Sequence, residues 1–171
     1  MTTPILYLFV GYPGAGKTTI SKIIEQLTSA EHLWADHVRG KMFGSPNHST
    51  EESQRLYEHL NLEAAKLLAS GKSVIYDTNF NFKSDREALR KVANEHNADT
   101  TLIWVTTPLE IACRRAVQQS ANQSTRVLGS MTQSEFDTIV AKLEAPDKAE
   151  NPIKIDGTKF DVESIKHHLS L

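Results

Sequence analysis

The sequence is poor in cysteine, in long apolar runs and in net charge, and each shortage excludes a class of protein. Cys113 is its one cysteine, which excludes an intramolecular disulfide and a zinc site built from several cysteines. No apolar run is long enough to span a membrane, and the apolar segment 5–10 is too short for a signal peptide. The formal net charge of −2 argues against a broad nucleic-acid surface but allows a local basic patch.

The size and composition indicate one ordinary globular domain. Of the 171 residues, 39% are hydrophobic and 23% are charged, a balance that supports a packed core rather than a disordered tail. The sequence contains no internal repeat and no low-complexity segment. We therefore expect a single cytoplasmic domain over residues 1–171, with no membrane association.

Strand-like and helix-like segments alternate along almost the whole chain. Strands are predicted at 5–10, 32–35, 73–77, 101–105 and 153–156. Helices are predicted at 17–27, 36–43, 49–71, 84–96, 107–119, 132–143 and 162–169. Several helix starts carry capping residues, namely Ser49, Ser84, Thr107 and Thr132. The alternation predicts an α/β fold in which a parallel sheet of about five strands lies between two layers of helices.

A glycine-rich segment at 11–18 joins the first predicted strand to the helix that follows it. It reads G-Y-P-G-A-G-K-T and matches the phosphate-loop pattern G-x-x-x-x-G-K-[ST]. The glycines let successive backbone N–H groups face one anion, and the helix start adds its positive dipole end. We expect Lys17 to reach the β- and γ-phosphates of a nucleotide and Thr18 to place its hydroxyl on Mg²⁺. A glycine turn without a ligand is the alternative interpretation.

This loop in its strand–helix setting predicts a three-layer α/β/α P-loop NTPase fold. The residues expected to contact the nucleotide are Gly11, Pro13, Gly14, Ala15, Gly16, Lys17, Thr18 and Thr19. The expected ligand is a nucleoside triphosphate together with Mg²⁺.

Two acidic residues follow predicted strands, and ligands of open parallel sheets sit at the carboxyl ends of strands. Asp77 ends the strand at 73–77 and is expected to face the Mg²⁺ or the acceptor, although a turn or cap residue is the alternative. Asp36 follows the strand at 32–35 and is expected to deprotonate an acceptor hydroxyl. Arg39 lies one helical turn further and is expected to clamp an anionic group of the acceptor. The alternative for this pair is an N-cap aspartate and a solvated arginine.

The segment 108–130 is locally basic, with three arginines and one acidic residue. Arg114 and Arg115 lie late in the helix predicted at 107–119, and Arg126 lies beyond a polar stretch. We expect a short lid at about 116–131 that closes over the nucleotide, with an arginine that neutralises charge during phosphoryl transfer. Cations that favour a helix C-terminus are the alternative explanation.

In their order along the chain, these features resemble the P-loop kinase family called AAA_33, or "predicted kinase". They are also similar to the 5′-kinase domain of bacteriophage polynucleotide kinase. The resemblance rests on the segments 11–18, 34–39, 74–79, 107–115 and 143–153. Relatives often carry a second arginine where this chain has Gln118 and Gln119, so either Arg126 replaces it or the lid works with fewer charges.

The resemblance implies a role for each candidate residue. It implies that Asp36 activates the acceptor hydroxyl and that Arg39 holds an acceptor phosphate. Asp77 would serve the acceptor and metal region, and Arg114 or Arg115 would be the lid arginine.

The sequence therefore supports a kinase that transfers the γ-phosphate of ATP, with Mg²⁺, to a hydroxyl of a small molecule or of a nucleotide or polynucleotide. The mild charge favours a small acceptor, because a polynucleotide needs several phosphate contacts, although a nucleic-acid end stays open. The alternative from another class is a nucleotide-binding regulatory ATPase with little phosphotransfer activity.

Overall fold

The computed structural model describes residues 2–118 and 130–171, and its centre is a parallel sheet. The strands lie in the order β2-β3-β1-β4-β5, and every neighbouring pair is parallel. Their bounds are β1 Ile5–Val10, β2 Glu31–Trp34, β3 Val74–Asp77, β4 Asp99–Val105 and β5 Ile153–Ile155. The predicted α/β class with a five-stranded parallel sheet is confirmed.

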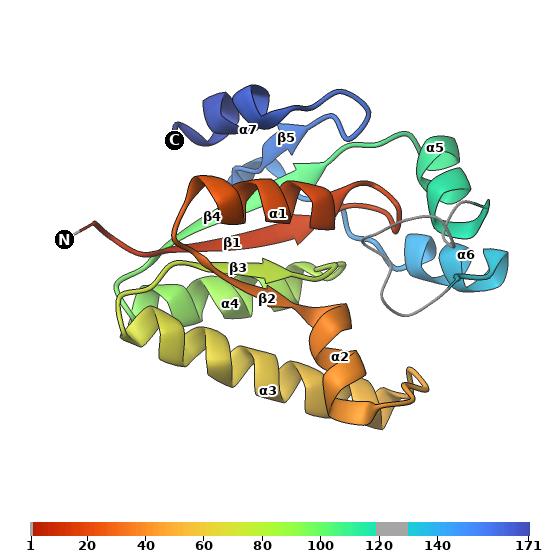
Figure 1. Ribbon diagram of the computed structural model, residues 1–171, viewed down its shortest axis with the longest axis horizontal. Helices are drawn as coiled ribbons and strands as arrows, with labels where there is room; N and C mark the ends of the chain where they lie inside the picture. Colours follow the sequence, from red (N-terminus) through yellow and green to blue (C-terminus); the bar gives the residue numbers. More distant parts are fainter. Residues whose placement is uncertain (1, 119–129) are drawn as a thin grey trace.

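Helices cover both faces of this sheet, as parallel sheets require. In Figure 1, α1 and α7 lie on one face and α3 and α4 on the other, while α2, α5 and α6 lie beyond the tips of the strand arrows. The helices are α1 Lys17–Leu27, α2 Ala35–Phe43, α3 Thr50–Ala69, α4 Lys83–Glu95, α5 Leu109–Cys113, α6 Gln133–Ala141 and α7 Val162–Leu169. A π-helical turn, η1 Arg114–Gln118, continues α5, and a 3₁₀ turn, η3 Lys148–Glu150, precedes β5.

The central strand β1 contributes side chains to the core on both faces of the sheet. Leu6 and Leu8 pack in the cluster that includes α3 and α4, whereas Tyr7 and Phe9 pack in the cluster that includes α1 and α7. Alternate residues of a strand point to opposite faces, so a strand buried on both sides is apolar throughout. This is why a continuous apolar run, rather than an alternating one, marked β1 in the sequence.

Two of the four predicted helix caps form, and two are wrong. The Ser49 and Thr132 hydroxyls each accept the backbone N–H expected of an N-cap, at 3.2 Å. Ser84 is not the cap of α4, which begins one residue earlier, and the N–H of Lys83 is instead bound by Glu144 at 2.8 Å. Thr107 is not the cap of α5 either, because its hydroxyl donates to the carbonyl of Ala15 at 2.7 Å. Tertiary partners replaced the local caps in both cases.

The predicted lid lies for the most part outside the described residues. The structure describes η1 up to Gln118 and resumes at residue 130, so Gln119 and Arg126 fall outside it. Within the described residues, no helix is both long and apolar enough to cross a membrane.

Candidate active site

The glycine-rich segment 11–16 forms a tight turn between β1 and α1. Gly14 and Gly16 have φ angles of 78° and 111°, a region that glycine enters at no steric cost. Gly16 is the N-cap of α1, and no side chain caps this helix start. Ala15 is buried, Pro13 is partly buried, and Thr19 is exposed in the first turn of α1. The predicted phosphate loop therefore has the conformation that its chemistry needs, with a helix N-terminus directly behind it.

The phosphate loop is clamped by segments from the far half of the chain. A Cβ atom on Gly14 would lie 2.3 Å from the carbonyl oxygen of Ala112 in α5. A Cβ atom on Gly157, just after β5, would lie 2.0 Å from the Thr107 hydroxyl and 2.2 Å from the carbonyl oxygen of Ala15. The sequence analysis missed Thr107 and Gly157 as supports of the loop, and a glycine directly after the last strand was the available signal.

We expect Gly14→Ala to destabilise the fold more than Gly71→Ala. The two glycines have almost equal φ angles, 78° and 79°, so both alanine variants pay about 1 kcal/mol for the left-handed backbone. Only Gly14 faces a close neighbour, since nothing lies within 4 Å of a Cβ on Gly71. The overpacking adds about 1–3 kcal/mol. Urea unfolding of both variants measures the difference, and equal losses would contradict the clamp.

The Lys17 side chain folds back over the loop. Its ammonium group donates to the carbonyl oxygens of Gly11 and Tyr12, each at 2.8 Å. These bonds hold a positive charge above the loop, where Lys17 was expected to meet phosphate oxygens.

Thr18 and Asp77 meet, although 59 residues separate them. The Thr18 hydroxyl donates to Oδ1 of Asp77 at 3.2 Å, and only 4% of Asp77 is exposed. A hydroxyl and a carboxylate oxygen are hard donors of the kind that Mg²⁺ prefers, and Mg²⁺ sites often use few protein ligands because phosphates and waters complete the shell. The described residues contain no group of three or more acidic, His or Cys side chains placed to hold a metal alone.

His32, in the neighbouring strand β2, also binds Asp77. Its Nε2 lies 3.0 Å from Oδ2 of Asp77 and its Nδ1 lies 3.2 Å from Oε2 of Glu25. Burial lowers the pKa of His32, but the hydrogen bonds and charges of Asp77 and Glu25 outweigh burial, so the net pKa lies above its ordinary value. The imidazolium form donates from both nitrogens and suits two carboxylates. Sequence reasoning treated this segment only as a strand, and the β2–β3 register is what brings His32 to Asp77.

Asp36 and Arg39 occupy the same helix but different environments. Asp36 is exposed in the first turn of α2, beyond the carboxyl end of β2. Arg39 is 6% exposed and donates to Oε1 of Glu52 at 2.6 Å and to the Ser53 hydroxyl at 3.2 Å. The structure thus places Arg39 in a buried ion pair between α2 and α3.

Glu52 uses the same carboxylate to hold the loop before α3. It accepts the backbone N–H groups of Asn47 at 2.8 Å and of His48 at 3.2 Å. Burial raises the pKa of Glu52, but these two bonds and Arg39 lower it by more. The net pKa therefore lies below its ordinary value. The carboxylate therefore stays charged, and Arg39 helps to fix the segment that follows α2.

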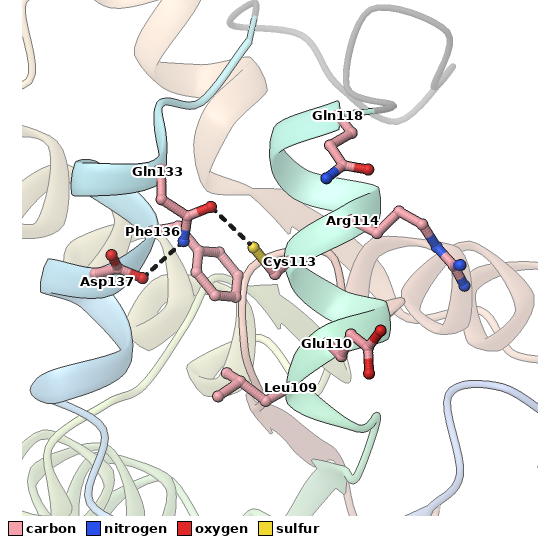
Figure 2. A pocket seen from close by; sticks show the side chains of 8 residues that line it. All are labelled: Leu109, Glu110, Cys113, Arg114, Gln118, Gln133, Phe136 and Asp137. Carbon is pink, nitrogen blue, oxygen red and sulfur yellow. Dashed lines mark hydrogen bonds between the residues drawn. The ribbon is translucent and has the colours of Figure 1, made fainter.

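The two described arginines of the basic segment, Arg114 and Arg115, point in different directions. Arg115 donates to the carbonyl oxygen of Gly157 at 3.0 Å, which ties η1 to the loop after β5. Arg114 projects from the side of the helix away from α6, next to Glu110 (Figure 2). Between this helix and α6 lies a groove of about 370 Å³, where Phe136 packs and Cys113 contacts Gln133 at 3.3 Å.

The five-stranded parallel sheet and the phosphate loop between β1 and α1 define a P-loop NTPase-type α/β domain. The chain belongs to the AAA_33 family, described as an AAA domain, whose model matches residues 6–146. A comparison with curated proteins gave no match.

Solved structures share this fold across almost the whole chain. A suspected kinase from Chloroflexus aurantiacus is 22% identical with a TM-score of 0.77, covering 99% of this chain and 98% of that one. The APS kinase CysC of Mycobacterium tuberculosis, solved with AMPPNP and APS, is 18% identical with a TM-score of 0.69 and the same coverage. A gluconokinase from Sinorhizobium meliloti is 17% identical with a TM-score of 0.62, covering 97% of this chain and 88% of that one. The fold is therefore that of P-loop kinases.

Proposed function

We propose that this protein is an ATP-dependent phosphotransferase that moves the γ-phosphate to an alcohol group. The observation that carries the proposal is the convergence of Lys17, Thr18 and Asp77 at one edge of the sheet. Asp36 follows β2 at the same edge, because Trp34 pairs with Asp77 in the parallel register. Asp77 and the candidate base Asp36 thus follow the neighbouring strands β3 and β2, at the edge where a parallel sheet binds its ligands.

The phosphate loop and the start of α1 bind the triphosphate of ATP through backbone N–H groups and Lys17. Thr18 and Asp77 hold Mg²⁺, which neutralises charge on the β- and γ-phosphates when it is bound. Lys17 exchanges its two carbonyl partners for phosphate oxygens. The similarity to named APS kinase and gluconokinase folds supports ATP as the donor and a small acceptor.

Asp36 accepts the proton of the acceptor hydroxyl, whose oxygen forms a bond to the γ-phosphorus. The bond from that phosphorus to the bridging oxygen breaks, and ADP leaves with its electron pair. Arg114, Arg115 and Arg126 are the candidates for neutralising the charge that develops. Arg39 and Glu52 fix α2 against α3 and thereby hold Asp36 in place, while an anionic acceptor would have to share Arg39 with Glu52.

The proposal is tested with ATP labelled at the γ-phosphate and pooled nucleosides, sugars, antibiotics and 5′-hydroxyl oligonucleotides. A labelled ester in any pool supports it, and separation of the pool identifies the acceptor. If no pool yields an ester while ATP is hydrolysed at the same rate throughout, the regulatory ATPase becomes the better interpretation.

We expect Lys17→Ala to weaken ATP binding about 10- to 100-fold, the effect of losing a charge-assisted hydrogen bond of about 1.5–3 kcal/mol. Transfer should fall with it. Calorimetric titration with AMPPNP measures the affinity. Lys66→Ala is the matched control, since Lys66 pairs with Glu63 on an exposed surface and should leave binding unchanged. Unaltered affinity in Lys17→Ala would refute the assignment of the loop.

A further inference from the structure

Four side chains form one hydrogen-bonded chain between α1 and the neighbouring strands β2 and β3. It runs from Glu25 through His32 and Asp77 to Thr18, with contacts of 3.2, 3.0 and 3.2 Å. Both ends stand on α1, while His32 and Asp77 come from β2 and β3. The side chains of His32 and Asp77 are only 7% and 3% exposed. The His32–Asp77 contact therefore lies in the interior, where packing fixes hydrogen-bond geometry, whereas Glu25 at the end of the chain is half exposed.

The ring of His32 is also held from the side. Trp34 lies two residues further along β2, and its ring stacks on His32 with 6.0 Å between centroids and 12° between planes. The ammonium group of Lys22 lies 4.8 Å from the centroid of the Trp34 ring. Packing thus fixes the plane of the imidazole, and Glu25 fixes its rotation.

We infer that His32 is a positioning residue, which holds Oδ2 of Asp77 so that Oδ1 faces Thr18 and the Mg²⁺ of the nucleotide. The inference rests on the proposed function, because Mg²⁺ and ATP enter through it. A buried carboxylate needs a partner on each oxygen, and among the described residues His32 and Thr18 are the side chains that bind Asp77. Without His32, Oδ2 loses its donor and the carboxylate is free to rotate away from the position that Mg²⁺ requires.

Positioning and electrostatics predict opposite signs for the loss of His32. A protonated His32 repels a cation near Asp77, so a purely electrostatic role means that its removal strengthens Mg²⁺ binding. A positioning role means that its removal weakens Mg²⁺ binding. The direction of the change therefore separates the two explanations.

Two amide variants provide the test. Glutamine places its side-chain nitrogen where His32 has Nε2, and asparagine places its own where His32 has Nδ1. His32→Gln therefore keeps the donor to Asp77, whereas His32→Asn loses it. Glu31→Gln is the control, because Glu31 lies on the same strand and pairs with Lys72 in an exposed salt bridge.

Binding of AMPPNP is measured by calorimetry, with EDTA and over a range of Mg²⁺ concentrations, so that turnover is not the readout. We expect His32→Asn to raise the Mg²⁺ concentration needed for half of the gain in affinity about tenfold. Its affinity in EDTA should equal that of the wild type. His32→Gln and Glu31→Gln should behave like the wild type, and thermal unfolding checks that each variant is folded.

The inference would be overturned if His32→Asn needed the same Mg²⁺ concentration as the wild type, or a lower one. It would also be overturned if His32→Gln raised this concentration as much as His32→Asn does. If His32→Asn does not fold, Glu25→Ala decides, because it removes the acceptor of Nδ1 and releases the ring of His32 but keeps the bond to Asp77. It should raise the Mg²⁺ concentration needed for half of the gain in affinity by less than tenfold, and an unchanged concentration would overturn the inference. A wild type that binds AMPPNP without any Mg²⁺ effect would instead overturn the proposed function, and the role of His32 with it.

Discussion

Replacing Asp36 with asparagine is expected to lower phosphoryl transfer by about 10²- to 10⁴-fold, the usual contribution of a general base, and to leave ATP affinity unchanged. The reason is geometric and chemical. Asp36 is exposed at the start of α2, which is a different element from the phosphate loop but lies at the same edge of the sheet. Asparagine keeps the size and polarity of the side chain and removes its capacity to accept a proton.

Transfer of labelled phosphate and calorimetry with AMPPNP measure these two effects separately. Glu51→Gln is the matched control, because Glu51 is an exposed acid in the first turn of α3 and has no proposed role. A wild-type rate in Asp36→Asn would remove Asp36 from the mechanism. A parallel loss of AMPPNP binding would show that Asp36 serves the nucleotide rather than the acceptor.

Arg86→Met is expected to lower the free energy of unfolding by about 3–5 kcal/mol, as when a buried ion pair loses one partner. Arg86 is fully buried in α4 and donates to both carboxylate oxygens of Glu150 at 2.7 and 2.9 Å, and to the carbonyl of Phe80 at 2.9 Å. The substitution leaves Glu150 charged and unpaired in the interior. Lys91→Met is the control, since Lys91 and Glu95 form an exposed pair on the same helix, worth at most about 1 kcal/mol.

Urea unfolding measures both losses. The double variant Arg86→Met/Glu150→Met should lose less than Arg86→Met alone, because it no longer leaves an unpaired charge. If Arg86→Met and Lys91→Met cost the same, the buried pair does not hold η3 to α4.

The same ion pair gives the fold a dependence on acid. The hydrogen bonds from Arg86 outweigh burial and hold the pKa of Glu150 below its ordinary value of 4.5. A lowered pKa stabilises the folded state above the unfolded pKa, and this contribution is lost as the pH falls through the folded pKa. Arg86→Met should therefore reduce the slope of stability against pH below about pH 4.5.

The sequence was most informative where chemistry depends on neighbours along the chain. The phosphate loop needs Gly11, Gly16, Lys17 and Thr18 at fixed spacing, so its position between a strand and a helix followed from the motif alone. Helix starts at Ser49 and Thr132 followed for the same reason, since a capping side chain acts on its own helix. The expectation that Thr18 and Asp77 both serve one Mg²⁺ came from the rule that ligands sit at the carboxyl ends of parallel strands, whereas the pairing of β1 with β3 that brings them together is seen only in the structure.

Long-range packing decided what the sequence analysis missed. The Thr107 hydroxyl had a local use as a cap, but the carbonyl of Ala15, 92 residues away, binds it instead. Arg39 was expected to bind an acceptor because no partner for it is visible nearby in the sequence. Its partner in the structure, Glu52, belongs to another helix. His32 reads as an ordinary strand residue until the register of β2 against β3 is known. No periodicity in a single sequence encodes such contacts.

The most direct measurement is the fate of the labelled γ-phosphate of ATP once an acceptor pool has been added. The account predicts that the label moves into a phosphate ester of the acceptor faster than it appears as inorganic phosphate. It also predicts that Asp36→Asn suppresses the ester while AMPPNP still binds with Mg²⁺. Label found solely as inorganic phosphate, at a rate that no acceptor changes, would contradict the assignment of this protein as a phosphotransferase.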